Sequence, residues 1–588
     1  MFKVFEIIMQ LFEVSFECGN KVGGIHTVIS TKSKEMIKRY GDNYICIGFY
    51  EKSKAANEVM LEKIPEQWKD AFRELEAKGI KCYYGRWMAA NKARIILVDS
   101  KEFEKNNINK IKAEHWEKYG IDSLRTDAFY NEPVAWAHAC GMLIEKIGNF
   151  PYLTHFHEWL SGAALLYLEE RIPNLPSVFT THATVFSRTI GASIEKVRDL
   201  KKEEIERIAK ERNIIAKHQM EKLCAHKAKV VTTVSDITKE EVEKILERKV
   251  DIVAYNAIDF SSIKKGYEII AESDSLREEL EKFLISYFAP YYKIDVKDKP
   301  IIFTSGRYEF WNKGFDLFIE SLGKLDKRLR DKTTVFAFIL VPTGTRGLKE
   351  DVLDNLLLFN KFGEIIKEDL KKIEKDILYR FALGEKIYLD DKELLHHINA
   401  IESIMKKQGH PELCPFELDY DENNDLILQN LKKVGLENKV ENSVKVIFYP
   451  RFLKISDEIL KLNYKEFLKT ADIGIFLSRY EPFGYTPLET ASYVTCSVTS
   501  DYGGFGNLIR ALRKENRGIW VINAVNRDRE TIINELTNLL EWFCLLDKEE
   551  RTELEVKARD SAEFFDWSNF INNYFIAYNM ALERSGIY

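Results

Sequence analysis

The chain has 588 residues, 45% hydrophobic and 31% charged, which is the composition of a globular protein too long for a single core. Its 93 acidic and 87 basic residues give a net charge of −6, so electrostatics offer no reason to expect a nucleic-acid partner. No apolar run is long enough to span a bilayer, and we expect no membrane partner.

Cysteine usage and the N-terminus predict a cytoplasmic protein. Eight cysteines are scattered without a Cys-x-x-Cys pair, which suggests neither a disulfide framework nor a zinc site. The apolar N-terminus carries Glu6 and Glu13, so it predicts a buried strand rather than a signal peptide.

Short apolar runs alternate with longer amphipathic stretches along the chain. This alternation is typical of parallel sheets joined by right-handed helical crossovers. We predict two doubly wound domains of class α/β. Strands are expected at residues 11–16, 44–49, 94–98, 152–156, 177–181, 229–234 and 251–255, and then at 300–305, 334–341, 444–449, 473–477, 497–500 and 518–522.

Two stretches interrupt this alternation. The polar stretch at residues 260–299 predicts a domain boundary. Residues 346–409 are strongly helical in pattern, without a strand signal, and predict a helical hairpin projecting from the second domain. That hairpin is either a solvated charged helix pair or an oligomer contact, and its pattern favours neither.

Ligands of open α/β sheets bind beyond the carboxyl ends of the strands, so the loops there are the candidate sites. The first, FECGNKVGGIHTV, places Gly23 and Gly24 before a predicted helix, with Lys21 nearby. Small residues let backbone N–H groups approach a phosphate at a helix N-terminus. This signal is weak by itself.

Two further loops carry cations or a histidine. VFTTHATVFSR places His182 at a strand end and Arg188 six residues later; a lone histidine in this position is as often structural as functional. SGRYEFWNKGFD places Arg307 and Lys313 between a strand and a helix that begins near Gly314. Two cations there can hold a diphosphate, and the surrounding aromatic residues argue against a merely charged surface loop.

The fourth loop, LSRYEPFGYTPLET, carries two glutamates. Thr486 is predicted as N-cap, Pro487 as the first helical residue and Glu489 as the partner in a capping box. That explains Glu489 structurally, whereas Glu481 has no such role. HFHEW is not HExxH, and no phosphate-binding P-loop, GxSxG motif or metal-ligand spacing occurs, so no metal site is predicted.

Taken together, the motifs LFEVSFECGNKVGGIHTV, HFHEWLSG, TTHATVFSR, SGRYEFWNKGFD, VKVIFYPRFL and YEPFGYTPLE resemble those of animal- and fungal-type glycogen synthases. The resemblance extends from about residue 11 to Trp567. It implies the GT-B fold, in which two Rossmann-like domains face a cleft. Residues 1–265, completed by a helix at 568–588, would form one domain, and residues 290–567 the other.

The same resemblance implies an activity. These enzymes transfer glucose from UDP-glucose to the nonreducing 4-hydroxyl of an α-1,4-glucan (glycogen), with retention of configuration and without metal or cofactor. Retention would proceed by front-face departure and attack, in which the β-phosphate helps to deprotonate the acceptor. Glu481 is then catalytically important without being a nucleophile.

Roles follow position by position from the family motifs. Glu481 and Glu489 match the E-x7-E motif, the first lying beside the donor glucose and the second binding the ribose. Arg307 and Lys313 would hold the diphosphate and stabilise the leaving group. The remaining matches are His182 for the sugar 6-hydroxyl, Arg188 for the phosphate side, Asn256 near the donor, Tyr464 stacking on uracil, and the backbone around Tyr485, Thr486, Gly23 and Gly24 for the phosphates.

Two departures from the family concern regulation and assembly. Regulated members carry an arginine-rich helix that binds glucose-6-phosphate. Here the segment reads DKEERTELEVKAR and retains only Arg551, Lys557 and Arg559, and the chain ends soon after the last predicted helix, so we expect an unregulated enzyme. The family builds its tetramer contact where the helical insertion lies, which favours a homotetramer.

Other functions remain open. A related retaining GT-B transferase, using ADP-glucose or making a disaccharide, is the nearest alternative, because Tyr464 can stack on either base. A non-catalytic glucan-binding scaffold is disfavoured, since it predicts damaged motifs and Glu481, Arg307 and His182 are all present.

Overall fold

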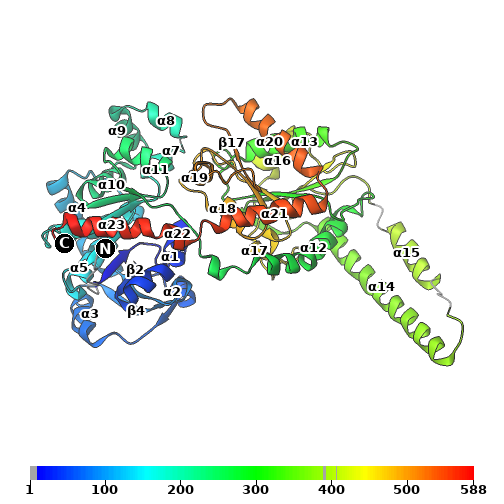
Figure 1. Ribbon diagram of the computed structural model, residues 1–588, viewed down its shortest axis with the longest axis horizontal. Helices are drawn as coiled ribbons and strands as arrows, with labels where there is room; N and C mark the ends of the chain where they lie inside the picture. Colours follow the sequence, from blue (N-terminus) through cyan, green and yellow to red (C-terminus); the bar gives the residue numbers. More distant parts are fainter. Residues whose placement is uncertain (1–8, 192, 388–391, 405–406, 588) are drawn as a thin grey trace.

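The computed structural model describes residues 9–191, 193–387, 392–404 and 407–587. The N-terminal strand prediction can therefore be followed only from Met9 onward. Two separate sheets, each covered by helices, lie side by side (Figure 1). No helix in the described ranges is both long and apolar enough to cross a membrane.

The first sheet has a parallel core in the order β5-β2-β1-β6-β7-β8-β9. Its strands agree with the predicted runs because most are buried along their whole length, as strands covered on both faces are. They are β1 (Leu11–Val14), β2 (Tyr44–Phe49), β5 (Ala93–Asp99), β6 (Leu153–His157), β7 (Ser177–Thr181), β8 (Val230–Thr233) and β9 (Ile252–Val253).

One edge of this sheet is antiparallel, so the prediction of a wholly parallel sheet was wrong there. β4 (Lys81–Trp87) pairs antiparallel with β5, and β3 (Val59–Leu61) pairs antiparallel with β4. Several side chains of both strands are exposed or half-buried. They therefore lack the continuous apolar run by which the other strands were recognised.

The second sheet is parallel throughout, in the order β14-β11-β10-β15-β16-β17. Numbered along the chain this is the order 3-2-1-4-5-6 of dinucleotide-binding folds, and the core of the first sheet begins in the same way. The doubly wound prediction is thus confirmed. The strands are β10 (Ile301–Ser305), β11 (Val335–Leu340), β14 (Val444–Tyr449), β15 (Ile473–Ile475), β16 (Cys496–Ser500) and β17 (Ile519–Ile522).

Helices cover both sheets (Figure 1). Those between strands of the first sheet are α1 (Gly24–Tyr40), α2 (Lys52–Glu58), α3 (Lys69–Glu76), α4 (Lys101–Tyr119), α5 (Ala128–Ile147), α6 (Gly162–Glu169), α7 (Val185–Ile190), α8 (Ile194–Asp199), α9 (Lys202–Glu211), α10 (Ile215–Lys227) and α11 (Asp236–Glu241). Those that follow are α12 (Gly266–Phe288), α13 (Phe315–Arg328), α16 (Leu426–Lys433), α17 (Tyr464–Leu468), α18 (Tyr485–Ser492), α19 (Gly504–Ala511) and α20 (Arg529–Cys544).

The last helices return to the first sheet. Each sheet with its helices is called a body, the first built on the first sheet and the second on the second sheet. α21 (Lys548–Glu563) packs on the second body. α22 (Trp567–Phe570) and α23 (Asn572–Arg584) reach the first body, where α23 contacts β6, β7, β8 and β9 (Figure 1). The indole N–H of Trp567 donates to Thr31 Oγ1 at 2.7 Å. Buried Tyr574 and Tyr578 seal the contact.

A helical hairpin projects from the second body, as predicted (Figure 1). It consists of α14 (Glu350–Leu383) and α15 (Lys392–Ile404). At its base, β12 (Thr345–Leu348) pairs antiparallel with β13 (Phe416–Leu418). The expectation that residues 346–409 contain no strand was therefore wrong at their start, because the short segment TRGL has no apolar run that would reveal it.

Candidate functional site

The carboxyl ends of the central strands of both sheets open into one cavity of about 550 Å³. Strand order reverses between β1 and β6 and between β10 and β15, and doubly wound folds bind ligands at such points. Predicted site residues from both bodies line the cavity: Gly23, Gly24, His182, Arg188, Asn256, Arg307, Lys313, Glu481, Tyr485 and Thr486. Lys21, Tyr464 and Glu489 are not among the lining residues.

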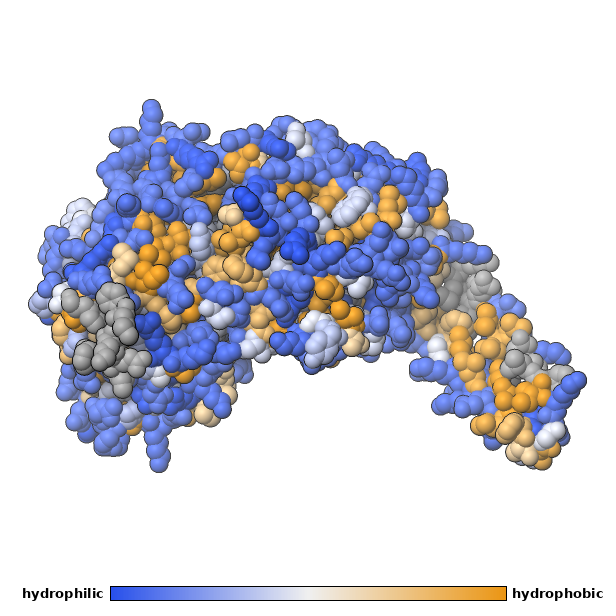
Figure 2. Space-filling view, in the orientation of Figure 1, coloured by the Kyte–Doolittle hydropathy of each residue, from blue (hydrophilic) through white to orange (hydrophobic). Residues whose placement is uncertain are grey.

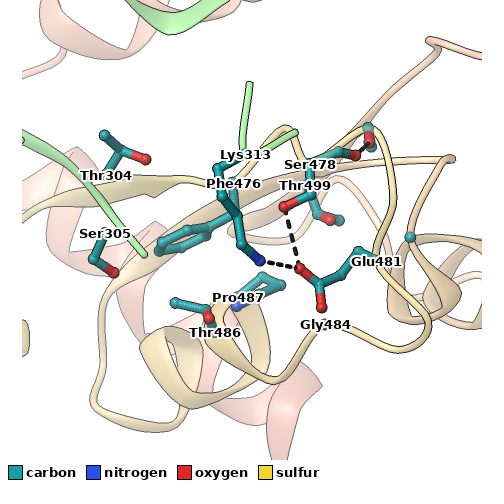
Figure 3. Close-up of a pocket in the computed structure, with 12 residues that line it drawn as sticks. Thr304, Ser305, Lys313, Phe476, Ser478, Glu481, Gly484, Thr486, Pro487 and Thr499 are labelled. Carbon is teal, nitrogen blue, oxygen red and sulfur yellow. Dashed lines mark hydrogen bonds and ion pairs between the residues drawn. The ribbon is translucent and has the colours of Figure 1, made fainter. Parts of the chain in front are cut away.

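Glu481 and Lys313 form an ion pair in the cavity wall (Figure 3). Lys313 Nζ lies 2.7 Å from Glu481 Oε2, and Ser478 Oγ donates to the same oxygen at 3.1 Å. Burial raises the pKa of Glu481, but Lys313 and Ser478 outweigh this and leave the pKa below its usual value. The carboxylate is therefore ionised at neutral pH.

The backbone at Gly484 decides how this loop enters α18. Gly484 is the N-cap with φ of 100°, and Thr486 makes no capping hydrogen bond. The predicted capping box is therefore wrong, since the helix begins at Tyr485 and glycine readily adopts the positive φ needed there. Without the cap, the structural explanation of Glu489 disappears.

The arginines of the cavity, Arg307 and Arg188, are exposed to solvent. The Arg307 side chain is 78% exposed and pairs with Glu309 at 2.9 Å. Arg188 is exposed and makes no ion pair with any described residue. Asn256 is buried, and its Oδ1 has no hydrogen-bond partner in the described part of the chain. These groups are available to an anionic, hydroxyl-bearing ligand.

The predicted phosphate cradle at the start of α1 is partly occupied. Glu17 Oε2 accepts hydrogen bonds from the N–H groups of Gly23, at 2.8 Å, and His26, at 2.9 Å. The N–H of Gly23 is therefore not free, contrary to the sequence-based expectation. Sequence inspection missed Glu17, because its role depends on the loop folding back on itself. Lys21 is exposed beside this turn.

Tyr464 and Glu489 are outside the lining of the main cavity. The Tyr464 hydroxyl bonds to Ser305 Oγ at 2.9 Å, and Ser305 lines a small adjoining hollow together with Glu481 and Thr486. Burial raises the pKa of Glu489, and Lys465 and Lys21 oppose the shift. The Tyr485 hydroxyl donates to Ala257 O of the first body at 3.2 Å.

His182 contacts residues of the HFHEW segment, which was given no role in the sequence analysis because it does not match HExxH. Its Nε2 lies 2.9 Å from Nδ1 of His157, whose Nε2 lies 2.7 Å from Glu13 Oε1. Glu158 has a positive φ of 63°, a strained geometry that clusters at functional sites. Its carboxylate accepts hydrogen bonds from the N–H groups of His182 and Ala183. The HFHEW segment, which contains His157 and Glu158, was the sequence signal from which these two residues could have been identified.

Glu13, His155 and His157 bring ligand atoms within 4.8 Å of one another. Their sequence positions conceal this cluster, because β1 and β6 are adjacent only in the folded sheet. The ammonium of Lys32 lies 2.5 Å from Glu13 Oε1 and already supplies the positive charge. The group therefore fits an internal ion pair and does not fit a metal site.

The family model and the curated relatives that match this chain give the same family. The model described as glycogen synthase matches residues 13–586. The chain is 30% identical to glycogen [starch] synthase of Neurospora crassa, over 98% of this chain and 84% of that one, and 29% identical to the liver glycogen [starch] synthase of Mus musculus, over 98% and 83%.

Among solved structures, the catalytic domain of starch synthase IV from Arabidopsis thaliana bound to ADP and acarbose superposes with a TM-score of 0.55. It shares 14% identity, with 98% of this chain and 99% of that chain covered. At that identity the likeness concerns the fold alone, which is GT-B.

Proposed function

Because the chain belongs to the glycogen synthase family, we propose that it transfers glucose from UDP-glucose to the nonreducing 4-hydroxyl of an α-1,4-glucan. Transfer proceeds with retention of configuration and without a metal ion or other cofactor. The observation that carries the proposal is the cavity between the two sheets, where an ionised Glu481 meets Lys313, Arg307, Arg188 and His182.

The charges of this cavity suit a diphosphate leaving group. Lys313 and Arg307 approach from one body and Arg188 from the other, and fixed cations stabilise the charge that develops as the glycosidic bond breaks. Ionised Glu481 lies beside Lys313 and favours the positive charge that grows on the sugar. The departing phosphate takes the acceptor proton from the same face, so configuration is retained.

The direct test is incorporation of labelled glucose into glycogen from UDP-glucose and from ADP-glucose. We expect incorporation with UDP-glucose at the higher kcat/KM. A preference for ADP-glucose would favour the related-synthase alternative, and a soluble disaccharide product would favour the disaccharide-forming one. Glycogen binding without turnover of either donor would leave only the alternative of a non-catalytic glucan-binding scaffold. We place the reaction in the cytoplasm, consistent with eight free cysteines.

We expect no activation by glucose-6-phosphate. The retained arginines of α21 are already partnered: Arg551 with Asp472 at 2.9 Å, and Arg559 with Glu563 at 3.0 Å. Asp472, the partner of Arg551, also lines the hollow beside it. A phosphate monoester entering there would meet cations that carboxylates of the protein already neutralise.

The assay compares initial rates with and without glucose-6-phosphate at subsaturating UDP-glucose, and we expect rates equal within error. Inorganic phosphate at the same ionic strength is the control for nonspecific anion effects. Activation of several-fold, specific to the sugar phosphate, would contradict the expectation.

We further propose that the hairpin α14–α15 joins four copies of the chain. Figure 2 shows an apolar surface on the projecting hairpin. It is formed by exposed large side chains that the second body cannot cover, among them Leu357, Leu370, Leu378, Tyr379, Phe381, Leu383 and Leu395. Contiguous exposed apolar surface of this kind marks interaction sites, and the hairpin is where the family builds its tetramer contact.

Light scattering should show an assembly of four 68.6 kDa chains. The double variant Leu378→Glu/Phe381→Glu is expected to shift the mass toward that of smaller species, because it buries charge at the contact. The exposed Trp116 of α4 offers a matched control, as Trp116→Glu changes an apolar residue outside the hairpin. A monomeric wild-type chain would refute the assembly.

A further inference from the structure

A chain of hydrogen bonds runs from the cavity wall into the first body. His182 lines the cavity and lies 2.9 Å, Nε2 to Nδ1, from His157. His157 Nε2 lies in turn 2.7 Å from Glu13 Oε1. The side chains of His157 and Glu13 are fully buried. The end of this chain that meets a ligand is therefore His182.

One positive and one negative charge balance at the inner end. The Lys32 ammonium lies 2.5 Å from Glu13 Oε1 and 3.9 Å above the ring of Tyr574, and the Tyr44 hydroxyl donates to Glu13 Oε2 at 2.5 Å. A protonated His157 would add a second buried cation without a second anion, which is costly. His157 is therefore neutral.

The pKa directions agree with this charge count. Burial raises the pKa of Glu13, but Lys32 and the neighbouring histidines reverse the shift and hold it well below its usual value. Burial, reinforced by His155, lowers the pKa of His157 to about 3. Burial, reinforced by His157, places the pKa of His182 well below its usual value.

Neutral rings and an ionised carboxylate determine the direction of every bond. A carboxylate can only accept, so His157 carries its proton on Nε2 and donates to Glu13. Nδ1 of the same ring then holds a lone pair and can only accept. His182 must therefore donate from Nε2, which leaves its Nδ1 without a proton.

We propose that Glu13 and His157 are positioning residues that hold His182 as the Nε2–H tautomer, so that Nδ1 of His182 accepts a hydrogen bond from a hydroxyl group of the donor sugar. The identity of the sugar rests on the proposed function, whereas the tautomer does not. A site built to accept from a hydroxyl rejects analogues that cannot donate.

The tautomer of His182 can be determined without measuring catalysis. Protein labelled with 15N-histidine is measured by long-range nitrogen–proton correlation at pH 7.5, with His182→Asn and His157→Asn used to assign the two rings. We expect protons on Nε2 of both rings and bare Nδ1 atoms. A proton on Nδ1 of His182, or an imidazolium at either ring, would overturn the proposal whatever reaction the protein catalyses.

Substitution at His157 tests the positioning role. His157→Phe keeps an aromatic ring but removes the acceptor, so a second His182 tautomer should appear. We expect kcat/KM to fall roughly 10- to 100-fold, by analogy with the outer partners of metal-ligating histidines. His157→Asn retains an acceptor oxygen and should recover most of the loss. Activity of the Phe variant equal to that of the wild-type protein would count against the positioning role of His157. If that variant fails to fold, the nitrogen–proton spectrum of the wild-type protein decides the tautomer.

Analogues of the donor sugar test whether Nδ1 of His182 accepts the hydrogen bond. With the wild-type protein, UDP-glucose analogues carrying hydrogen or fluorine in place of the 6-hydroxyl should be comparably poor substrates, because neither can donate to Nδ1. Fluorine can accept a weak hydrogen bond. A fluoro analogue more than tenfold better than the deoxy analogue would show that His182 donates instead.

Discussion

Lys313→Ala is expected to lower kcat by about 10²- to 10³-fold, the usual consequence of removing one group that stabilises developing charge. Lys313 lies 2.7 Å from Glu481 in the cavity wall, so the substitution removes a cation from the leaving-group side and leaves a carboxylate unpaired. Glu481→Gln should lose activity on a similar scale. Initial rates of glucose incorporation from UDP-glucose measure both effects.

The chain offers a matched control. Lys324, on the following helix α13, pairs with the exposed Glu530 outside the cavity. Lys324→Ala should leave kcat within about twofold, because exposed ion pairs contribute little. Lys313→Ala and Glu481→Gln combined should lose less than the product of the single effects, since the two groups interact directly. Full activity of either single variant would refute the assignment of the cavity.

The second large effect concerns acid stability. His155, His157 and His182 are buried and neutral; burial, reinforced by Lys32, lowers the pKa of His155 to about 4, and that of His157 is about 3. An unfolded histidine binds a proton below about pH 6.5, whereas these folded ones do not. Their stabilisation is therefore complete above pH 6.5 and is lost progressively as the pH falls.

Each such histidine lowers the free energy of unfolding by about 1.4 kcal/mol per pH unit in that window, so the three together amount to roughly 4 kcal/mol per unit. Thermal unfolding between pH 7.5 and 5 should show Tm falling steeply below pH 6.5. His155→Gln should make the decline shallower, while His226→Asn, at an exposed position, should not alter it. A Tm independent of pH over this range would contradict the neutral, buried state.

Strand positions were predictable because they depend on local pattern. The runs at residues 44–49, 177–181 and 444–449 coincide with β2, β7 and β14. Such strands are apolar throughout because helices cover both faces of the sheet. β4 escaped notice for the opposite reason: it lies next to the edge strand β3 and several of its side chains are exposed or half-buried, so the pattern that identifies a central strand disappears.

The sites were only partly predictable. Strand-end loops containing Glu481, Lys313, Arg307 and His182 indicated where a ligand could bind, and the fold brings them to one cavity. The capping box failed because Thr486, Pro487 and Glu489 satisfy a local rule that the positive φ of Gly484 overrides. The phosphate cradle expected at Gly23 is partly occupied for a similar reason, since the N–H of Gly23 already donates to Glu17.

Local sequence pattern was enough to predict the two doubly wound sheets, the projecting hairpin and the loops that carry the charged groups, because hydrophobic period and turn residues act over a few neighbouring positions. Which charged groups meet depends on how the sheets fold and pack. Parallel register sets Glu13 of β1 opposite His155 of β6, and His157 then lies between Glu13 and His182. Partners so distant along the chain leave no local period, and electrostatic pairing depends on distance in space alone.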